Sequence, residues 1–316
     1  MELTIAKLKG ITVHNPPRVH VVNVLITAIV YLILCHFLWA TNNIVGRWLS
    51  SYLDPFTITA LRWVLATPVY PMVLGLGVIR RSLSYIGLKS FILGLLGFTL
   101  FNFILYASLS IAPATLVGLA YGFTPALIVV LSTLLGESRP RLANLLGVLM
   151  SVVGVTVLFL WRGVELSSAK DTLGIIGGLL AGLLWALYTV LQQVFFRSSD
   201  RAALTLASLV LSLPATLLAS TPWLLRAPLS NLDIRTAIAI VWIAVMPGAV
   251  AYYMWNRAVS IVGSQTAAPF SNLLPVFVAI LGYITLGERV TLGDLVGGAL
   301  IVLGSTIALT LKPGNR

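Results

Sequence analysis

The sequence predicts an all-α polytopic membrane protein with ten transmembrane helices in a 5+5 inverted-topology repeat. Three observations predict this fold class. The composition is too apolar for a soluble domain, the chain contains apolar stretches long enough for ten membrane spans, and similar residues recur at nearly constant offsets in its two halves.

The composition excludes several classes of protein. Of the 316 residues, 59% are hydrophobic and 9% are charged, whereas a soluble domain has about 25% charged residues. The single cysteine, Cys35, excludes a disulfide-rich secreted scaffold. The net charge is +11, but the basic residues are scattered between apolar runs and form no stripe, so no nucleic-acid partner is expected. The expected surroundings are a lipid bilayer.

A spanning helix needs about 20 mainly apolar residues, so the spans are sought as stretches without Asp, Glu, Lys or Arg. These stretches are Val19–Gly46, Trp63–Ile79, Ser90–Gly136, Leu142–Trp161, Thr172–Phe196, Ala202–Leu225, Thr236–Asn256, Ala258–Gly287 and Leu295–Leu311. The third stretch is long enough for two helices, which we expect to be separated at Ser110–Pro113. The second helix is expected to begin near Phe56 and therefore to contain Arg62. The remainder forms short loops and two tails.

The distribution of Lys and Arg predicts the orientation, because cytoplasmic segments are enriched in these residues. With the N-terminus inside, 13 of the 20 basic residues fall in cytoplasmic segments, 6 fall in outer segments, and Arg62 lies within a helix. We therefore expect a multi-pass protein of the cell membrane whose tails, residues 1–20 and 312–316, are both cytoplasmic.

An internal repeat relates residues 21–161 to residues 172–311. An offset of 146 places Trp39 on Trp185, and an offset of 150 places Pro125 on Pro275. Leu135-Gly136-Glu137 recurs as Leu286-Gly287-Glu288. Chance similarity between Leu/Gly-rich helices is the alternative, but collinear matches disfavour it. Five helices per repeat is an odd number, so the second repeat enters the membrane from the opposite side, as in many secondary transporters.

Several short motifs resemble those of a known family. They are Leu38-Trp39-Ala40, Leu61-Arg62-Trp63, and the segment from Pro125 to Glu137 with its copy from Pro275 to Glu288. In this order they resemble the EamA-type branch of the drug/metabolite transporter superfamily, over about residues 20–312. The resemblance implies a transporter of small polar metabolites, often an exporter, that works by alternating access.

Arg62 is the first candidate for a binding residue. A cation in the hydrocarbon costs at least about 2.5–3.5 kcal/mol on insertion scales, so it must face a polar cavity or a partner. Its guanidinium could bind a substrate carboxylate or phosphate through two parallel hydrogen bonds. The structural alternative is that it binds carbonyl groups at helix ends or extends its charged group to the outer interface.

Polar and aromatic residues of helices 1, 3, 4, 6, 8 and 9 are expected to face the interior, because buried amides and indoles need partners. An offset of 150 places Asn102 on Tyr252 and Tyr106 on Asn256, which favours a site on the pseudo-two-fold axis. Interhelical hydrogen bonding without substrate contact is the alternative. The predicted substrate-binding residues are Trp39, Arg62, Asn102, Tyr106, Tyr121, Trp185, Tyr188, Gln192, Tyr252, Asn256 and Asn272.

This set predicts the chemistry of the substrate. Arg62 is expected to be the only positive charge within reach, and no Asp or Glu is expected in mid-membrane. An aromatic, amide-rich lining of this kind suits a neutral or zwitterionic metabolite, such as an amino acid, better than a cationic drug. The lack of a carboxylate also disfavours strong proton coupling, so His36 is the possible proton site.

Other residues are assigned to motion and to loop structure. Pro125 and Pro275 are possible hinges, because proline within a helix permits a kink. Glu137 and Glu288 are expected at helix ends, where they would fix a loop or pair with Arg139 or Arg289.

No catalytic motif is found. Two of the three histidines, His14 and His20, lie in the tail, and no cluster has metal-ligand spacing, so no enzyme, metal or cofactor is expected. A channel or the permease subunit of a larger complex is the alternative to a secondary transporter. The short cytoplasmic loops and the internal symmetry disfavour both. The partner is a small-molecule substrate, and the chain is expected to be a monomer or a weak dimer.

The orientation can be tested with a reporter. A phosphatase or fluorescent reporter fused after Arg316 is expected to give a cytoplasmic signal, because of the bias in basic residues. A signal from the outer side would overturn the orientation.

Overall fold

The structure, a computed structural model, describes residues 18–112, 114–161, 168–197, 199–227, 232–286 and 291–310, and all regular elements in these ranges are helices. Most of the N-terminal tail, the C-terminal tail, Gly287, Glu288 and Arg289 lie outside the described residues.

The first half of the chain contains five spans, of which the fourth is interrupted. In order, its elements are α2 (Arg18–Leu49), α3 (Pro55–Leu74), α4 (Gly77–Ser82), the 3-10 turn η1 (Leu83–Tyr85), α5 (Leu88–Gly94), the π-helical segment η2 (Leu95–Leu100), α6 (Phe101–Ile111), α7 (Ala114–Tyr121), α8 (Thr124–Leu134) and α9 (Leu142–Trp161). Helix 3 is the continuous run α5–η2–α6. Helix 4 consists of α7 and α8.

The second half follows the same plan. Its elements are α10 (Ala169–Phe195), α11 (Arg201–Leu224), α12 (Ile234–Ala244), the π-helical segment η4 (Val245–Val250), α13 (Ala251–Val262), α14 (Ser264–Ala267), the 3-10 segment η5 (Ala268–Asn272), α15 (Leu273–Leu286) and α16 (Leu292–Thr310). Nine helical runs in the described residues are long and apolar enough to cross a membrane, and the interrupted helix 4 is the tenth. The chain is thus a ten-helix polytopic membrane protein.

The predicted boundary between helices 8 and 9 was wrong. The sequence places it at Arg257, whereas α13 continues to Val262 and the chain turns at Gly263. Gly263 has a φ of +84°, a conformation that glycine adopts without strain. Arg257 is exposed near the end of its helix, so its charge does not end the span.

The aspartates explain where many helices begin. Asp54, Asp200 and Asp233 cap α3, α11 and α12 by accepting hydrogen bonds from free backbone N–H groups of the first turn. Asp171 forms a capping box with Ser168 at the start of α10. Asp294 accepts from the Thr291 backbone N–H at the start of α16. All five aspartates of the chain therefore lie at helix starts.

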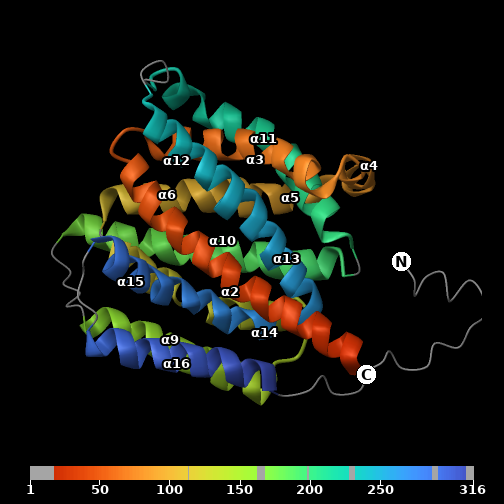
Figure 1. The fold of residues 1–316 in the computed structure, drawn as a ribbon, viewed down its shortest axis with the longest axis vertical. Coiled ribbons are helices and arrows are strands. Elements are labelled where there is room, and N and C mark those ends of the chain that lie inside the picture. Colours follow the sequence, from red (N-terminus) through yellow and green to blue (C-terminus); the bar gives the residue numbers. More distant parts are fainter. Residues whose placement is uncertain are drawn as a thin grey trace, which may run out of the picture.

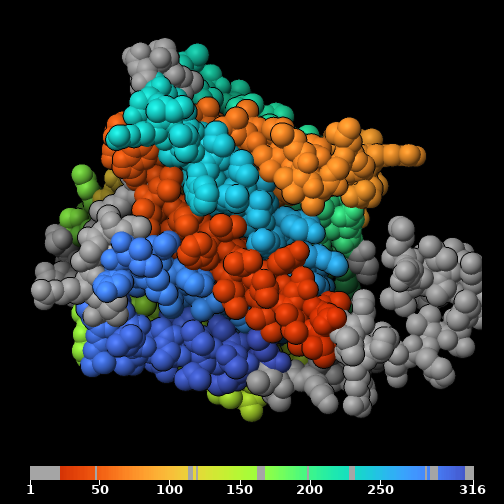
Figure 2. Space-filling view, in the orientation of Figure 1, coloured from red at the N-terminus to blue at the C-terminus, as the bar shows by residue number. Residues whose placement is uncertain are grey.

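Figure 1 shows how the helices are layered. The pair α3 and α11 lies at one edge of the molecule, and the pair α9 and α16 lies at the opposite edge. Between these pairs, α2, α12, α13 and α15 form a front layer, in which α2 packs against α13 and α15. Behind it, α10 packs against α6, α7 and α8, which together with α5 form a back layer. Figure 2 shows α2 crossing the front face between α13 and α15.

Four glycines allow α9 and α16 to cross closely. A Cβ added to Gly154 would lie 2.6 Å from the carbonyl oxygen of Gly297, and one added to Gly297 would lie 2.6 Å from that of Gly154. Gly147 and Gly304 meet in the same reciprocal way. An offset of 150 relates Gly147 to Gly297 and Gly154 to Gly304, so the crossing has the two-fold pattern expected of inverted repeats.

Adding one methyl group at this crossing is expected to destabilise the fold. Gly154→Ala would place its Cβ against backbone, and overpacking of this kind costs about 1–3 kcal/mol. The thermal midpoint in detergent should fall by roughly 2–10 °C. The control is Gly87→Ala, where an added Cβ has nothing within 4 Å. Equal midpoints for the two variants would contradict this account of the crossing.

Candidate functional site

A cavity of about 1230 Å³ lies between the front and back layers. It runs along the second half of α2, from Trp39 to Ser50 and Ser51 beyond the helix end. Trp48, Ser50 and Arg235 at this end are exposed, so the cavity opens where α2 ends and α12 begins.

Eight of the eleven predicted binding residues line this cavity. They are Trp39, Arg62, Asn102, Tyr106, Tyr121, Trp185, Tyr252 and Asn272. They come from α2, α3, α6, α7, α10, α13 and η5, and so from both repeats. Tyr188, Gln192 and Asn256 are buried and do not belong to the lining.

Arg62 is 2% exposed and is held by uncharged acceptors. Its Nη1 lies 3.3 Å from Asn42 Oδ1, 3.1 Å from Asn102 Oδ1 and 3.0 Å from the Tyr106 hydroxyl oxygen. Nη2 donates to the Pro247 carbonyl at 3.0 Å. No acceptor contacts its buried Nε within the described residues. The described lining contains no Asp or Glu, so the charge of Arg62 is not neutralised there.

A second arginine also reaches the cavity. Arg235, in the first turn of α12, lies at the mouth and is exposed. The expectation that Arg62 is the only positive charge within reach was therefore wrong. The sequence places Arg235 in an outer loop, and nothing in its spacing reveals that α12 brings it over the end of α2.

Aromatic rings form the inner end of the cavity. The ring of Trp39 lies edge-on to Trp185 at 5.1 Å and to Tyr252 at 5.8 Å between centroids. Trp185 and Tyr252 are 5.3 Å apart, also edge-on. Trp39 Nε1 donates to the Pro247 carbonyl, which fixes its ring. Such edge-to-face clusters are rigid and apolar, so they separate the cavity from the opposite end of the protein.

Beyond this aromatic floor, a polar network joins the two layers. Asn256 of α13 donates to the Tyr188 hydroxyl at 2.8 Å and to Thr205 Oγ1 at 2.9 Å. Gln192 donates to Asn256 Oδ1 at 3.0 Å. The three predicted residues outside the lining are thus close together, and they hold closed the end opposite the mouth.

Glu137 forms a second contact at this closed end. Its carboxylate accepts from the backbone N–H and the hydroxyl of Ser264, which begins α14. Arg197 donates to the backbone carbonyl of Glu137 at 2.9 Å. Burial raises the pKa of the Glu137 carboxyl, while the Ser264 hydrogen bonds and the nearby Arg197 and Arg201 charges act to lower it. The expected loop-fixing role agrees with these contacts, although the hydrogen bonds are with Ser264 rather than Arg139.

The two polar networks are related by the repeat. Asn42 and Tyr106 are joined by a hydrogen bond of 3.1 Å. Offsets of 146 and 150 carry these residues onto Tyr188 and Asn256, which are joined by one of 2.8 Å. The amide and the phenol have thus exchanged places between the repeats.

The π-helical segments obey the same symmetry. An offset of 150 carries η2 onto η4, and Gly97 onto Pro247. A π-helical turn leaves backbone groups without their usual helical partners. The Gly97 carbonyl accepts from the Tyr252 hydroxyl at 2.9 Å, and the Pro247 carbonyl accepts from Arg62 and Trp39. Sequence reasoning missed Pro247 and Asn42, although the proline within a span and the Asn pair in helix 1 were available signals.

His36 lies outside the cavity lining. Its ring is buried, 5.1 Å from the Trp39 ring and 5.4 Å from the Trp255 ring, and its Nδ1 lies 2.5 Å from the Leu32 carbonyl oxygen. A proton on His36 would thus reach the cavity only past Trp39.

The two possible hinge prolines follow irregular backbone. Pro125 lies in the first turn of α8, after the break that separates α7 from α8. Pro275 is the third residue of α15, after the 3-10 segment η5. Both prolines therefore begin α-helical segments that follow irregular backbone in helices 4 and 9.

Comparisons with known proteins agree on one family. A model of the EamA-like transporter family matches residues 26–160 and again residues 172–310. Uncharacterized transporter YyaM of Bacillus subtilis is 25% identical over 274 residues, which are 85% of this chain and 88% of that one. Aromatic amino acid exporter YddG of Ancylobacter novellus is 25% identical over 87% of this chain and 94% of its own.

A plant relative and a solved structure extend these matches. WAT1-related protein At2g40900 of Arabidopsis thaliana is 23% identical over 84% of this chain and 72% of its own. A crystal structure with 23% sequence identity superposes with a TM-score of 0.73 over 89% of this chain and 96% of that one, which shows that the fold is shared.

The contact of Glu137 predicts a pH dependence. Because its pKa is raised in the folded protein, its protonated form favours folding, and this contribution is lost as the pH rises through the folded-state pKa. We therefore expect the thermal midpoint of the parent, minus that of Glu137→Gln, to increase as the pH falls from about 7 to about 4.

Asp233→Asn is the matched control for this measurement. Hydrogen bonds from Thr236 lower the pKa of Asp233, so its contribution to stability is lost as the pH falls. The thermal midpoint of the parent, minus that of Asp233→Asn, should therefore decrease as the pH falls. The same slope for both variants would contradict the assignment to Glu137.

Proposed function

The chain belongs to the EamA-like transporter family, and from this premise we propose that it is a secondary transporter which moves a zwitterionic metabolite, such as an amino acid, across the cell membrane by alternating access. The repeats 21–161 and 172–311 would be its two functional units. The observation that carries the proposal is the unneutralised charge of Arg62 in the wall of the central cavity.

Arg62 supports a substrate with a carboxylate. Its acceptors are two amides, a phenol and a backbone carbonyl, so none cancels its charge. Because Arg62 is 2% exposed, a carboxylate in contact with its guanidinium would gain a stronger interaction than in bulk water. The guanidinium would bind the carboxylate in place of one or more of these uncharged acceptors, through the two parallel hydrogen bonds that its geometry favours.

The rest of the lining supports a mixed apolar and polar substrate. Trp39, Tyr121 and Trp185 offer aromatic faces to a side chain. The amide groups of Asn43 and Asn272, also in the lining, offer acceptors to an ammonium group. YddG, a relative of similar length, is named as an aromatic amino acid exporter, which supports both the substrate class and export as the direction.

Alternating access would be a movement of the front layer against the back layer. With both termini cytoplasmic, the mouth at the end of α2 faces outward, and the end held by Tyr188 and Asn256 faces the cytoplasm. Inward opening would break the hydrogen bonds of Asn256 and of Glu137 with the opposite layer and close the mouth. Pro125 and Pro275 would be the hinges of helices 4 and 9, and the pairs α3–α11 and α9–α16 would be the fixed edges.

The mode of coupling follows from the same lining. With no carboxylate in the described lining, facilitated diffusion or exchange fits better than proton antiport, and His36 allows at most a weak proton linkage. Exchange accelerated by substrate on the opposite side distinguishes such a carrier from a channel. The chain would act as a monomer or a weak dimer.

The proposal is tested by removing, in turn, the carboxylate of the ligand and the guanidinium of Arg62. Tryptophan binding to purified protein is compared with that of tryptophanamide, which lacks the carboxylate. In the parent, the amide is expected to bind ten- to a hundredfold more weakly, since a hydrogen bond between charged groups contributes about 1.5–3 kcal/mol. In Arg62→Gln the two ligands should bind alike, and Arg62→Lys should restore only part of the difference.

Arg235→Gln is the matched control, because it removes the other arginine of the cavity. It should keep the preference for the carboxylate. If Arg235→Gln abolishes the preference while Arg62→Gln retains it, the carboxylate binds at the mouth. If the folded parent shows no preference, Arg62 is structural and the proposal fails.

A further inference from the structure

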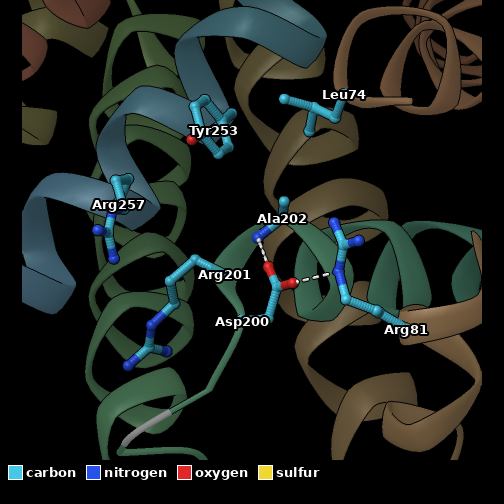
Figure 3. Close-up of a pocket in the computed structure, with 7 residues that line it drawn as sticks. All are labelled: Leu74, Arg81, Asp200, Arg201, Ala202, Tyr253 and Arg257. Atoms are coloured by element: carbon cyan, nitrogen blue, oxygen red, sulfur yellow. Dashed lines mark hydrogen bonds and ion pairs between the residues drawn. The ribbon is translucent and has the colours of Figure 1, made fainter. Parts of the chain in front are cut away.

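A second cavity, of about 320 Å³, lies at the closed end of the protein, away from the central cavity. It is formed where the end of α3, the short helix α4, the start of α11 and the helix α13 meet (Figure 3). Its lining residues are Leu74, Arg81, Asp200, Arg201, Ala202, Tyr253 and Arg257.

The charges in this cavity do not balance. Three arginines face one carboxylate. Asp200 Oδ2 accepts from Arg81 Nε at 2.7 Å, and Asp200 Oδ1 accepts from the first-turn N–H groups of α11, so both oxygens are occupied. The two remaining arginines, Arg201 and Arg257, both lie on the side of Asp200 away from Arg81 in Figure 3.

Neither of these two arginines forms an ion pair in the described part of the chain, although the charge of Glu137 acts on Arg201 from a distance. Arg201 is 2% exposed and donates to the Gln192 carbonyl and to Gln193 Oε1, which are uncharged, and its buried Nε has no acceptor in the described part of the chain. Arg257 is close enough for its charge to act on Arg201. An anion placed between them would relieve this repulsion.

The stretch of chain that supplies Leu74 and Arg81 to the cavity also exposes apolar side chains. Met72, Leu76 and Leu83 are 80%, 76% and 61% exposed and flank Arg80 and Arg81. Exposed apolar side chains beside arginines are typical of a segment that lies at the interface between lipid tails and headgroups. Leu74 and Tyr253 continue this apolar surface into the cavity.

We propose that this cavity binds the phosphate group of an anionic phospholipid. The phosphodiester would lie between Arg257, Arg201 and the free nitrogen atoms of Arg81, and the acyl chains would cover Met72 and Leu76. Basic pockets between transmembrane helices bind such headgroups. The apolar rim favours a lipid over free phosphate, which would gain nothing from the exposed Met72 and Leu76.

The experiment is a lipid titration of the full-length, delipidated protein, followed by native mass spectrometry. Dioleoyl phosphatidylglycerol is expected to occupy one site more tightly than dioleoyl phosphatidylcholine. Arg257→Gln should weaken phosphatidylglycerol binding about fivefold, the effect of one arginine near a membrane surface, and bring it close to that of phosphatidylcholine. Arg257→Lys should retain most of the binding, because it keeps the charge.

Arg80→Gln is the control. Like Arg257→Gln it removes one positive charge, but Arg80 lies in α4, is exposed and does not line the cavity. Its affinity for phosphatidylglycerol should equal that of the parent. Equal losses in Arg80→Gln and Arg257→Gln would overturn the site in favour of general surface charge. Lack of preference for phosphatidylglycerol would also overturn it, and displacement of the lipid by inorganic phosphate would show that free phosphate is the ligand.

Discussion

The guanidinium of Arg62 is the interaction on which the centre of the molecule depends. A cation inside an apolar bundle persists only when acceptors surround it, and here they come from α2, α6 and η4. The Pro247 carbonyl lies in the π-helical segment of helix 8, so irregular backbone in one helix supplies an acceptor for the buried charge of another. The same bonds fix Asn42 and Tyr106, and so shape the cavity wall.

A structural feature can be predicted from this sequence where a pattern of residues marks it. Leu142–Trp161 was predicted with its observed bounds, because charged or turn-forming residues end it on both sides. The end of helix 8 was misplaced, because Arg257 lies on an exposed face and does not interrupt the helix. The site was predicted in part. The polar and aromatic pattern identifies residues that face inward, but it does not distinguish those that line the cavity, such as Tyr252, from those that close its far end, such as Asn256.

The positions of the few acidic residues leave much of the positive charge of the chain unbalanced. All five aspartates begin helices, where their oxygens accept backbone hydrogen bonds. Arg81 and Asp200 form the ion pair found in the described residues. Because the chain has 20 basic and 9 acidic residues, positive charge is in excess, and in the described part of the chain some of it lies in the cavities, at Arg62, Arg201 and Arg235.

The exchange of amide and phenol between the two repeats has a thermodynamic consequence. A carrier turns over only when its two orientations are nearly isoenergetic, since each 1.4 kcal/mol of bias reduces one population tenfold. The Asn42–Tyr106 and Tyr188–Asn256 pairs occupy equivalent places in the repeats, but they are different hydrogen bonds. The phenol of Tyr106 donates to the amide oxygen of Asn42, whereas the amide of Asn256 donates to the phenol oxygen of Tyr188. The two repeats therefore offer related but unequal hydrogen bonds, and this inequality is one contribution of the sequence to the resting balance between the orientations.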